Sequence, residues 1–295
     1  DITERGRFVG LDFLSQGRYF WMNNGASGYY DYSSLRAKSM RTIYYRYNQI
    51  IPSALQTAAN YPHDRRNQPK DRRSLGSQEY NIYSSLVGGN GFWGNLGKMD
   101  DDERKNVGQI SSKYKRVANS VFAVRPKVTG SIGSSPEVYE FIDPEKAEGQ
   151  VIAFSGSILK TTYYTQPIQL DKLLGVLNHG YSVVDDHIRF DFEFTEPDAV
   201  RGCFILGDNQ FGASIVKSTC WLNDIRLEEN SLLKIINGAP GTVVINWYKK
   251  LGKPVFEAAN SGKNDVVITM EKHEKGMMII VDMKKGDVSL KIKTE

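Results

Sequence analysis

The spacing of apolar and polar residues divides the chain into two parts near residue 120. In the first part, a short aromatic run at 18–22 lies between glycine and asparagine residues, as in a buried strand that opens into a loop. Apolar residues then recur at helical spacing over 40–51, with Ser33 or Ser34 as the natural N-cap and Pro52 at the end. The pattern predicts one unit of strand, loop and helix.

Further units of the same kind follow. Apolar stretches at 51–59 and 80–87 are separated by a loop rich in proline and arginine. Asp100 and Glu103 then form a capping-box pattern at the start of an amphipathic helix. Alternating strands and helices predict a parallel sheet. Because about three units cannot close an eight-stranded barrel, we expect residues 1–120 to be one portion of a larger domain.

Beyond residue 120, apolar residues alternate with polar ones, which is typical of strands with one buried face. The clearest case is 187–194, where Ile and Phe alternate with His, Arg, Asp and Glu. Further strands are predicted as pairs of apolar runs on either side of a turn. They are 138–142 with 151–154, 232–236 with 243–247, and 266–270 with 278–283, followed by 288–292. Short strands with frequent turns predict a β-sandwich or jelly roll.

The expected fold class is therefore α/β followed by all-β. We expect the distal part of a (β/α)8 TIM barrel, followed by C-terminal antiparallel β-sandwich material. The barrel portion is placed at 1–120 and the start of the sandwich at 121–170. Residues 171–295 either continue that sandwich or form a separate sandwich module.

Charge and hydropathy exclude two kinds of partner. The 38 Lys and Arg residues against 34 Asp and Glu give a net charge of +4, too even a balance to indicate nucleic-acid binding. A local basic cluster at 65–73 is interrupted by acidic residues and prolines and is read as a solvated loop rather than a phosphate-binding patch. No apolar run approaches the roughly 18 residues that a bilayer span requires. We expect neither a nucleic-acid partner nor a membrane span.

Metal and cofactor sites are not indicated either. The four histidines lack ligand spacing, and Cys203 and Cys220 form no CxxC pattern. The two cysteines are either buried thiols or a disulfide, since spacing alone does not decide between them. The glycines at 88–91 form no dinucleotide or Walker fingerprint. We therefore expect no metal and no cofactor.

Several passages occur in the order found in one enzyme family. They are Gln16-Gly17-Arg18-Tyr19, Tyr30-Asp31-Tyr32, the glycine- and aromatic-rich run at 89–100, and the 138–154 hairpin with its Asp-Pro-Glu turn. On these passages, residues 12–160 resemble the distal barrel half and following sandwich of glycoside hydrolase family 36, the clan D α-galactosidases. The resemblance implies retaining hydrolysis of α-glycosides and favours a periplasmic or extracellular location. The nucleophile would lie in a missing N-terminal barrel half, in the same parent chain or a partner.

Asp31 is the general acid/base that the resemblance implies. Its tyrosine neighbours at 29, 30 and 32 would exclude water and raise its pKa toward the value that an acid catalyst needs. The alternative is a carboxylate at a helix N-terminus beside Ser33 and Ser34, where the helix dipole would lower the pKa. Hydrolysis needs two carboxyls that flank the bond, so Asp31 alone would not suffice.

Residues at the C-terminal ends of barrel strands face the active site in this fold. Asparagine can donate to and accept from sugar hydroxyls, and an indole can lie against the apolar face of a pyranose. On this basis the candidate substrate-binding residues are Arg18, Asn23, Asn24, Asn60, His63, Asn90 and Trp93. Trp93 either stacks on sugar or seals the barrel end.

Two functions follow. The first is an α-galactosidase-type glycoside hydrolase, of which this chain carries only the acid/base half, with an oligosaccharide or glycoside as substrate. The second is a non-catalytic carbohydrate-binding protein with a degenerate barrel and a β-sandwich binding module. The second is favoured by Phe20, which stands where the family often has Asp, and by Asn23 and Asn24.

Overall fold

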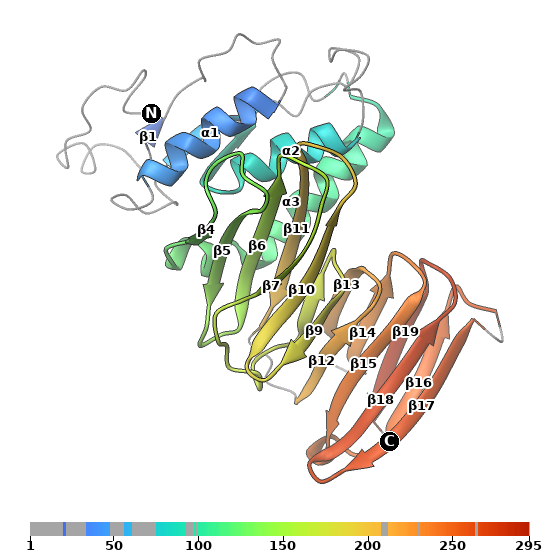
Figure 1. Cartoon of the computed structure of the whole chain (residues 1–295). Coiled ribbons are helices and arrows are strands. Elements are labelled where there is room, and N and C mark those ends of the chain that lie inside the picture. Colours follow the sequence, from blue (N-terminus) through green and yellow to red (C-terminus); the bar gives the residue numbers. More distant parts are fainter. Residues whose placement is uncertain are drawn as a thin grey trace. The chain divides into compact units, whose positions relative to one another are not determined.

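The structure, a computed structural model of the chain, describes most residues beyond the N-terminal region (Figure 1). The described residues are 20–21, 34–47, 56–60, 75–92, 97, 99–207, 212–228, 231–262 and 265–294. They divide into two compact units. Unit 1 comprises Asp1–Phe141, Ile152–Lys160 and Glu193–Arg201, and unit 2 comprises Ile142–Val151, Thr161–Phe192 and Gly202–Glu295.

The predicted fold class is wrong. Strands make up 49% and helices 20% of the structure, and the sheets are mostly antiparallel. The described residues contain three α-helices, and no pattern of an α/β barrel is present among them. The predicted alternation of strands and helices is present, but it is local. The described parallel strands are short and form a sheet of only three, so the barrel was an extrapolation from that alternation.

The helical part of unit 1 alternates strands with helices. Its parallel sheet has the order β1-β2-β3, with neighbouring strands paired parallel. The elements are β1 (Phe20–Trp21), α1 (Ser34–Tyr47), β2 (Gln56–Asn60), α2 (Leu75–Ser85), β3 (Gly89–Phe92) and α3 (Asp101–Ala123). The 80–87 stretch lies mostly in α2.

The packing of α1 against α2 depends on a glycine. Gly88 follows α2, and a Cβ there would lie 2.2 Å from Cε1 of Tyr44 on α1. Tyr44 is completely buried, so its ring cannot move aside without opening the helix interface. Gly88 is therefore required by close packing.

The capping box predicted at Asp100 is confirmed. Asp100 Oδ1 accepts a hydrogen bond from the backbone N–H of Glu103, and Glu103 Oε2 accepts one from the backbone N–H of Asp100, each at 2.8 Å. These bonds satisfy two donors that the first turn of α3 would otherwise leave unpaired. Tyr114 and Val117 lie on the buried face of the helix, as expected.

Antiparallel strands form the rest of the described chain. The five-stranded sheet has the order β4-β5-β6-β11-β8, the seven-stranded sheet β17-β18-β15-β12-β9-β10-β7, and the four-stranded sheet β13-β14-β19-β16. The strands are β4 (Lys127–Thr129), β5 (Glu137–Asp143), β6 (Glu148–Ser155), β7 (Leu159–Tyr164), β8 (Gly175–Leu177), β9 (Tyr181–Val184), β10 (His187–Phe194), β11 (Ala199–Leu206), β12 (Ala213–Ser218), β13 (Leu222–Glu228), β14 (Ser231–Asn237), β15 (Gly241–Tyr248), β16 (Pro254–Ala259), β17 (Val266–His273), β18 (Gly276–Met283) and β19 (Ser289–Thr294). A 3-10 turn, η6 (Lys249–Leu251), follows β15.

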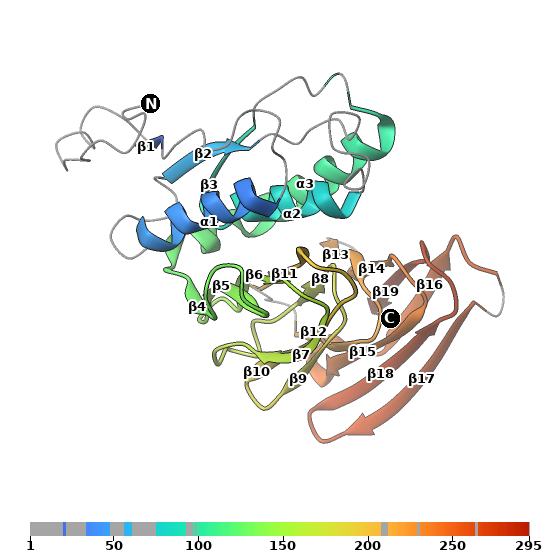
Figure 2. The same cartoon turned by 45° about the horizontal axis from the view of Figure 1, so that its top comes forward.

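The seven-stranded and four-stranded sheets lie as two layers in unit 2 (Figures 1 and 2). Each sheet buries alternate side chains, among them Ile245 and Trp247 on β15 and Leu290 and Ile292 on β19. The alternation predicted for 187–194 is confirmed, since β10 buries its Ile and Phe residues and turns its polar residues outward. In β10, one face of the strand is therefore apolar and the other polar.

The predicted pairing of 232–236 with 243–247 is wrong. Both segments are strands, but β14 pairs with β13 and β19, whereas β15 pairs with β12 and β18. Asn237 holds the connection between the two sheets. Its Nδ2 donates to the carbonyls of Ala239 and Lys285, and its Oδ1 accepts from the N–H of Val288. The turn residues therefore carry the chain from one layer to the other.

The pairing of 266–270 with 278–283 is confirmed in β17 and β18. The 138–142 and 151–154 runs lie in neighbouring strands, β5 and β6, as predicted. Cys203 and Cys220 are buried thiols rather than a disulfide.

Candidate functional site

Most of the residues predicted from sequence as catalytic or sugar-binding lie outside the described residues. They are Asp31, Arg18, Asn23, Asn24, His63 and Trp93. Asn60 ends β2 and Asn90 lies in β3, but only the backbone of these two residues is described. Their roles stay predictions, and a candidate site has to be built from other residues.

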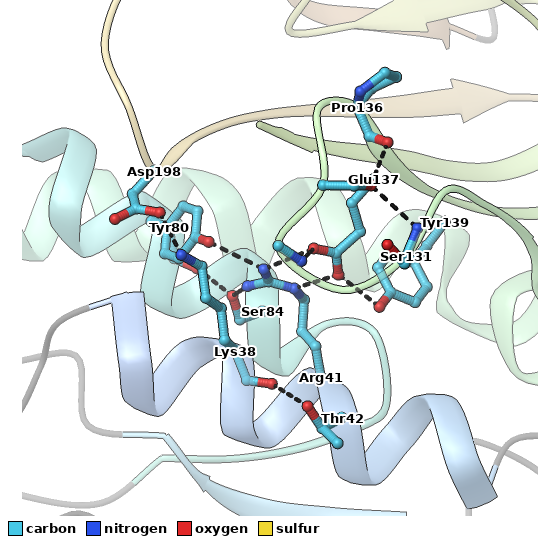
Figure 3. A network of polar contacts seen from close by, with 12 residues as sticks. Lys38, Arg41, Thr42, Tyr80, Ser84, Ser131, Pro136, Glu137, Tyr139 and Asp198 are labelled. Atoms are coloured by element: carbon cyan, nitrogen blue, oxygen red, sulfur yellow. Dashed lines mark hydrogen bonds and ion pairs between the residues drawn. The ribbon is translucent and has the colours of Figure 1, made fainter. Parts of the chain in front are cut away.

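A network of polar contacts in unit 1 surrounds Arg41 on α1 (Figure 3). Its guanidinium makes a bidentate pair with Glu137 at the start of β5, with Nε 2.7 Å from Oε1 and Nη2 2.9 Å from Oε2. Both side chains are completely buried. The flat guanidinium also lies over the Phe154 ring, 3.9 Å from its centroid. Such a planar, bidentate arrangement is specific to arginine.

The remaining polar atoms of this Arg41 cluster are also bonded. Arg41 Nη1 donates to Ser84 Oγ at 2.8 Å and Nη2 to the Tyr80 hydroxyl at 3.0 Å, both on α2. Glu137 accepts further bonds of 2.7 Å each from the Tyr139 hydroxyl and from the backbone N–H of Gly133. The cluster therefore ties both helices to β5 and the loop before it.

Electrostatics keep the pair charged. Burial acts to raise the pKa of Glu137, but the bonds and charge of Arg41, with the donors of Gly133 and Tyr139, outweigh it and lower the pKa. Burial beside the Glu137 carboxylate raises the pKa of Tyr139. The Tyr139 hydroxyl therefore remains a donor to Glu137 at neutral pH.

The Arg41 cluster suits a structural role rather than catalysis. Arg41, Ser84, Glu137 and Tyr139 expose no surface, so a substrate in solution cannot reach them. A catalytic acid or base must lie within hydrogen-bond reach of the substrate. Its hydrogen bonds hold α1 and α2 against β5.

A second cluster lies on the outward face of β7 and β10 in unit 2. Thr162 Oγ1 donates to Asp191 Oδ1 at 2.7 Å, and Thr165 N donates to the carbonyl of Ile188 at 3.0 Å. These contacts fix an antiparallel register in which each residue of β7 has one partner on β10. In this register Tyr164 lies directly opposite Arg189.

The same row continues across the sheet. Arg189 lies opposite Ser182 on β9, and Ser182 lies opposite Lys217 on β12. We call this surface the Tyr164 face. It comprises Thr162, Tyr164, Ser182, Arg189, Asp191 and Lys217.

Solvent reaches the Tyr164 face. Tyr164 is 47% exposed, and the side chains of Arg189 and Asp191 are 39% and 61% exposed. Arg189 donates from Nε and Nη2 to Asp191 Oδ1 at 3.2 and 2.9 Å. The face therefore presents an aromatic ring beside a positioned cation and anion.

Arg189 and Asp191 on the Tyr164 face each stabilise the charged form of the other. The hydrogen bond from Thr162 and the bonds and charge of Arg189 lower the pKa of Asp191. Asp191 in turn raises the pKa of Arg189. Both groups are thus charged at neutral pH and can bond to a ligand.

Sequence reasoning missed Tyr164. The alternation at 187–194 showed that Arg189 and Asp191 face water, but 159–164 was not recognised as a strand. The available signal was a Tyr at the end of a Thr-rich run, with alternate residues exposed.

No protein-family model matches the chain, and no curated protein matches it. The resemblance to glycoside hydrolase family 36 therefore stays a prediction.

Two absences hold for the part of the chain that the structure describes. No helix there combines the length and the apolar character that a membrane span requires. No group of three or more His, Cys, Asp or Glu side chains in those residues is arranged to hold a metal ion.

Proposed function

We propose that the chain binds carbohydrate through the Tyr164 face, as a non-catalytic binding module. The observation that carries the proposal is the exposed ring of Tyr164 opposite the Arg189–Asp191 pair. This is the second of the two functions considered from sequence, without the barrel.

An exposed tyrosine suits a sugar because its ring can lie against the apolar C–H face of a pyranose while its hydroxyl bonds to water or to a sugar hydroxyl. Sugar hydroxyls both donate and accept hydrogen bonds. The Tyr164 face offers donors in Arg189 and Lys217, an acceptor in Asp191, and the Ser182 hydroxyl, which can do both.

The preformed geometry favours binding. Thr162 and Arg189 already hold Asp191, so a ligand would not have to order this carboxylate. Less side-chain entropy is then lost on association. A sheet face with strands at regular spacing matches an extended oligosaccharide better than a compact metabolite.

The hydrolase prediction depended on a barrel and on a carboxyl pair. The fold correction removes the barrel, and Asp31 lies outside the described residues. The described residues therefore provide support for carbohydrate binding, through the Tyr164 face, and not for hydrolysis.

A glycan array followed by calorimetry tests the proposal. The chain should bind a subset of oligosaccharides on the array. Tyr164→Ala should weaken binding of those oligosaccharides by about tenfold or more, a change of ~1.4 kcal/mol. Tyr45→Ala is the matched control, because Tyr45 is a similarly exposed tyrosine on α1.

Two outcomes would remove the proposal. One is the absence of any glycan binding by the folded chain. The other is an equal loss of affinity in the Tyr45 and Tyr164 variants. Release of reducing sugar from the bound oligosaccharides would instead restore the hydrolase prediction.

A further inference from the structure

The β17 strand lies at one edge of the seven-stranded sheet. It pairs with β18 on one side, and no described strand pairs with its other side. The β17–β18 ladder runs over eight residue pairs without a bulge, and β17 contains no proline. Natural edges of this length usually carry a bulge, a proline or inward-pointing charges that prevent further pairing.

The phase of the hydrogen bonds along β17 follows from one contact. Lys284 N donates to the carbonyl of Asp265 at 2.8 Å, directly beyond the ladder. Antiparallel ladders alternate between hydrogen-bonded and non-hydrogen-bonded pairs. The odd-numbered residues of β17 therefore bond to β18. The N–H and C=O groups of the even-numbered residues point to the open edge, namely those of Val266, Ile268, Met270 and Lys272.

Apolar side chains lie along the first five residues of this edge, whereas Glu271, Lys272 and His273 end it. Val266, Ile268 and Met270 lie on the same face as the buried Ile279, Val281 and Met283 of β18. Met270 is nevertheless 52% exposed, and Val267 on the opposite face is 44% exposed. The edge thus combines unpaired backbone groups with apolar side chains that lack full cover from the described chain.

We propose that β17 pairs with β17 of a second copy of this chain. The two strands would run antiparallel about a two-fold axis and join the two seven-stranded sheets. The partner is a second copy because the strand is complementary to itself, as argued next. This inference does not depend on the proposed carbohydrate binding.

Charge pairing favours a register centred on Thr269 over the neighbouring one centred on Ile268. A two-fold axis perpendicular to the sheet keeps each face on its own side, so it must pass through a residue and its own copy. With the axis at Thr269, Ile268 lies opposite Met270 of the second copy, and Asp265 lies opposite His273. Shifting the axis to Ile268 would place Asp265 opposite Glu271, and like charges directly opposite destabilise a sheet.

The register also uses the open backbone groups. Ile268 and Met270 have their N–H and C=O groups at the edge, so they can form a hydrogen-bonded pair across the axis. Thr269 then forms a non-hydrogen-bonded pair with its own copy, where Cα atoms lie about 4.5 Å apart. This distance is within reach of a disulfide, whose Cα atoms lie about 4.4–6.8 Å apart.

Cysteine substitution tests the register directly. Under oxidising conditions, Thr269→Cys should give a covalent dimer on a non-reducing gel. Val267→Cys is the matched control, since its copies would lie about 13 Å apart at ~3.3 Å per residue. The native Cys203 and Cys220 are buried, so they contribute little background in folded protein.

Sedimentation velocity of the unmodified chain over a wide concentration range tests the association itself. A dimer should form reversibly as concentration rises. Ile268→Pro, which removes an edge N–H, and Met270→Lys, which adds a charge, should both remain monomeric with unchanged circular dichroism. Ile158→Lys alters a more exposed apolar residue elsewhere and should dimerise as the unmodified chain does.

A monomer at every concentration would overturn the proposal. So would a dimer that both Ile268→Pro and Met270→Lys leave intact, or equal cross-linking of the Thr269 and Val267 cysteine variants.

Discussion

Two arginine–carboxylate pairs in this protein have similar chemistry and different surroundings. Arg41 and Glu137 make two bonds to each other, and both expose none of their side-chain surface. Arg189 and Asp191 also bond to each other, but both remain in contact with water. Burial, not the identity of the residues, separates the two pairs.

The difference shows how one interaction serves two purposes. A buried pair is costly to break, because breaking it leaves an uncompensated charge in the protein interior. An exposed pair stabilises the fold little, because water and salt screen it. Its atoms are therefore available for a ligand, which is the basis of the proposed role of the Tyr164 face.

The largest expected effect is loss of the buried arginine. Arg41→Met leaves Glu137 buried without its cation and should lower the free energy of unfolding by about 3–5 kcal/mol. Urea titration followed by circular dichroism measures this. The matched control is Arg189→Met, whose unfolding midpoint should stay close to that of the unmodified protein. Equal shifts in the two variants would erase the distinction between the pairs.

Acid should weaken the fold through Glu137. Its folded-state pKa is lowered, so its contribution is complete above the unfolded-state pKa and is lost as pH falls through the folded-state pKa. Glu79 acts in the opposite sense. Burial raises its pKa, so its contribution is present at low pH and is lost as pH rises through the raised value.

Thermal unfolding across the acidic range separates the two carboxyls. Glu137→Gln should be less stable than the unmodified protein at neutral pH and should lose less of its remaining stability on acidification. Glu79→Gln should keep the acid sensitivity. Retention of the full acid sensitivity by Glu137→Gln would contradict the assignment.

A third pair lies between the two extremes. Lys38 Nζ and Asp198 Oδ1 are 2.7 Å apart, with side chains 30% and 24% exposed. Asp198→Ala should lower the free energy of unfolding by up to about 1 kcal/mol, between the effects at Arg41 and at Arg189. Asp198 also has a positive φ of 54°, so Asp198→Asn, which tolerates that backbone, is the control that removes only the charge. Urea unfolding of the two variants distinguishes charge from backbone strain.

The smallest effect on stability is expected on the Tyr164 face. Arg189→Ala should leave the unfolding midpoint unchanged within error while reducing glycan affinity in calorimetry. Lys234→Ala, on β14 of the other sheet, offers a control that should alter neither quantity. A large loss of stability in Arg189→Ala would place this residue in the fold rather than in binding.

Local features of the fold were predictable from sequence. The capping box at Asp100 and Glu103 depends on residues three apart, and the alternation in β10 reports directly which side chains are buried. Neither feature needs knowledge of a distant partner.

Strand pairing was less predictable. The segments at 232–236 and 243–247 looked like a hairpin because a turn separates them. Asn237 instead bonds to Lys285 and Val288, far along the chain, and these contacts direct the strands into different sheets. A turn motif alone does not contain that information.

The candidate sites depended still more on distant contacts. Arg41 and Glu137 are 96 residues apart, and nothing local marks either residue as buried. Tyr164 becomes a candidate binding residue only because Arg189 lies opposite it on β10. The catalytic prediction at Asp31 stays a prediction because that residue lies outside the described chain.

Mapping a bound oligosaccharide by amide chemical shifts tests the central claim most directly. The labelled chain would be titrated with an oligosaccharide selected on the glycan array. We predict that the largest shifts fall on β7, β9 and β10 around Tyr164 and Arg189, with α1 around Arg41 unchanged. Shifts centred on the Arg41 cluster, or none at all, would contradict the division between a structural pair and a binding pair.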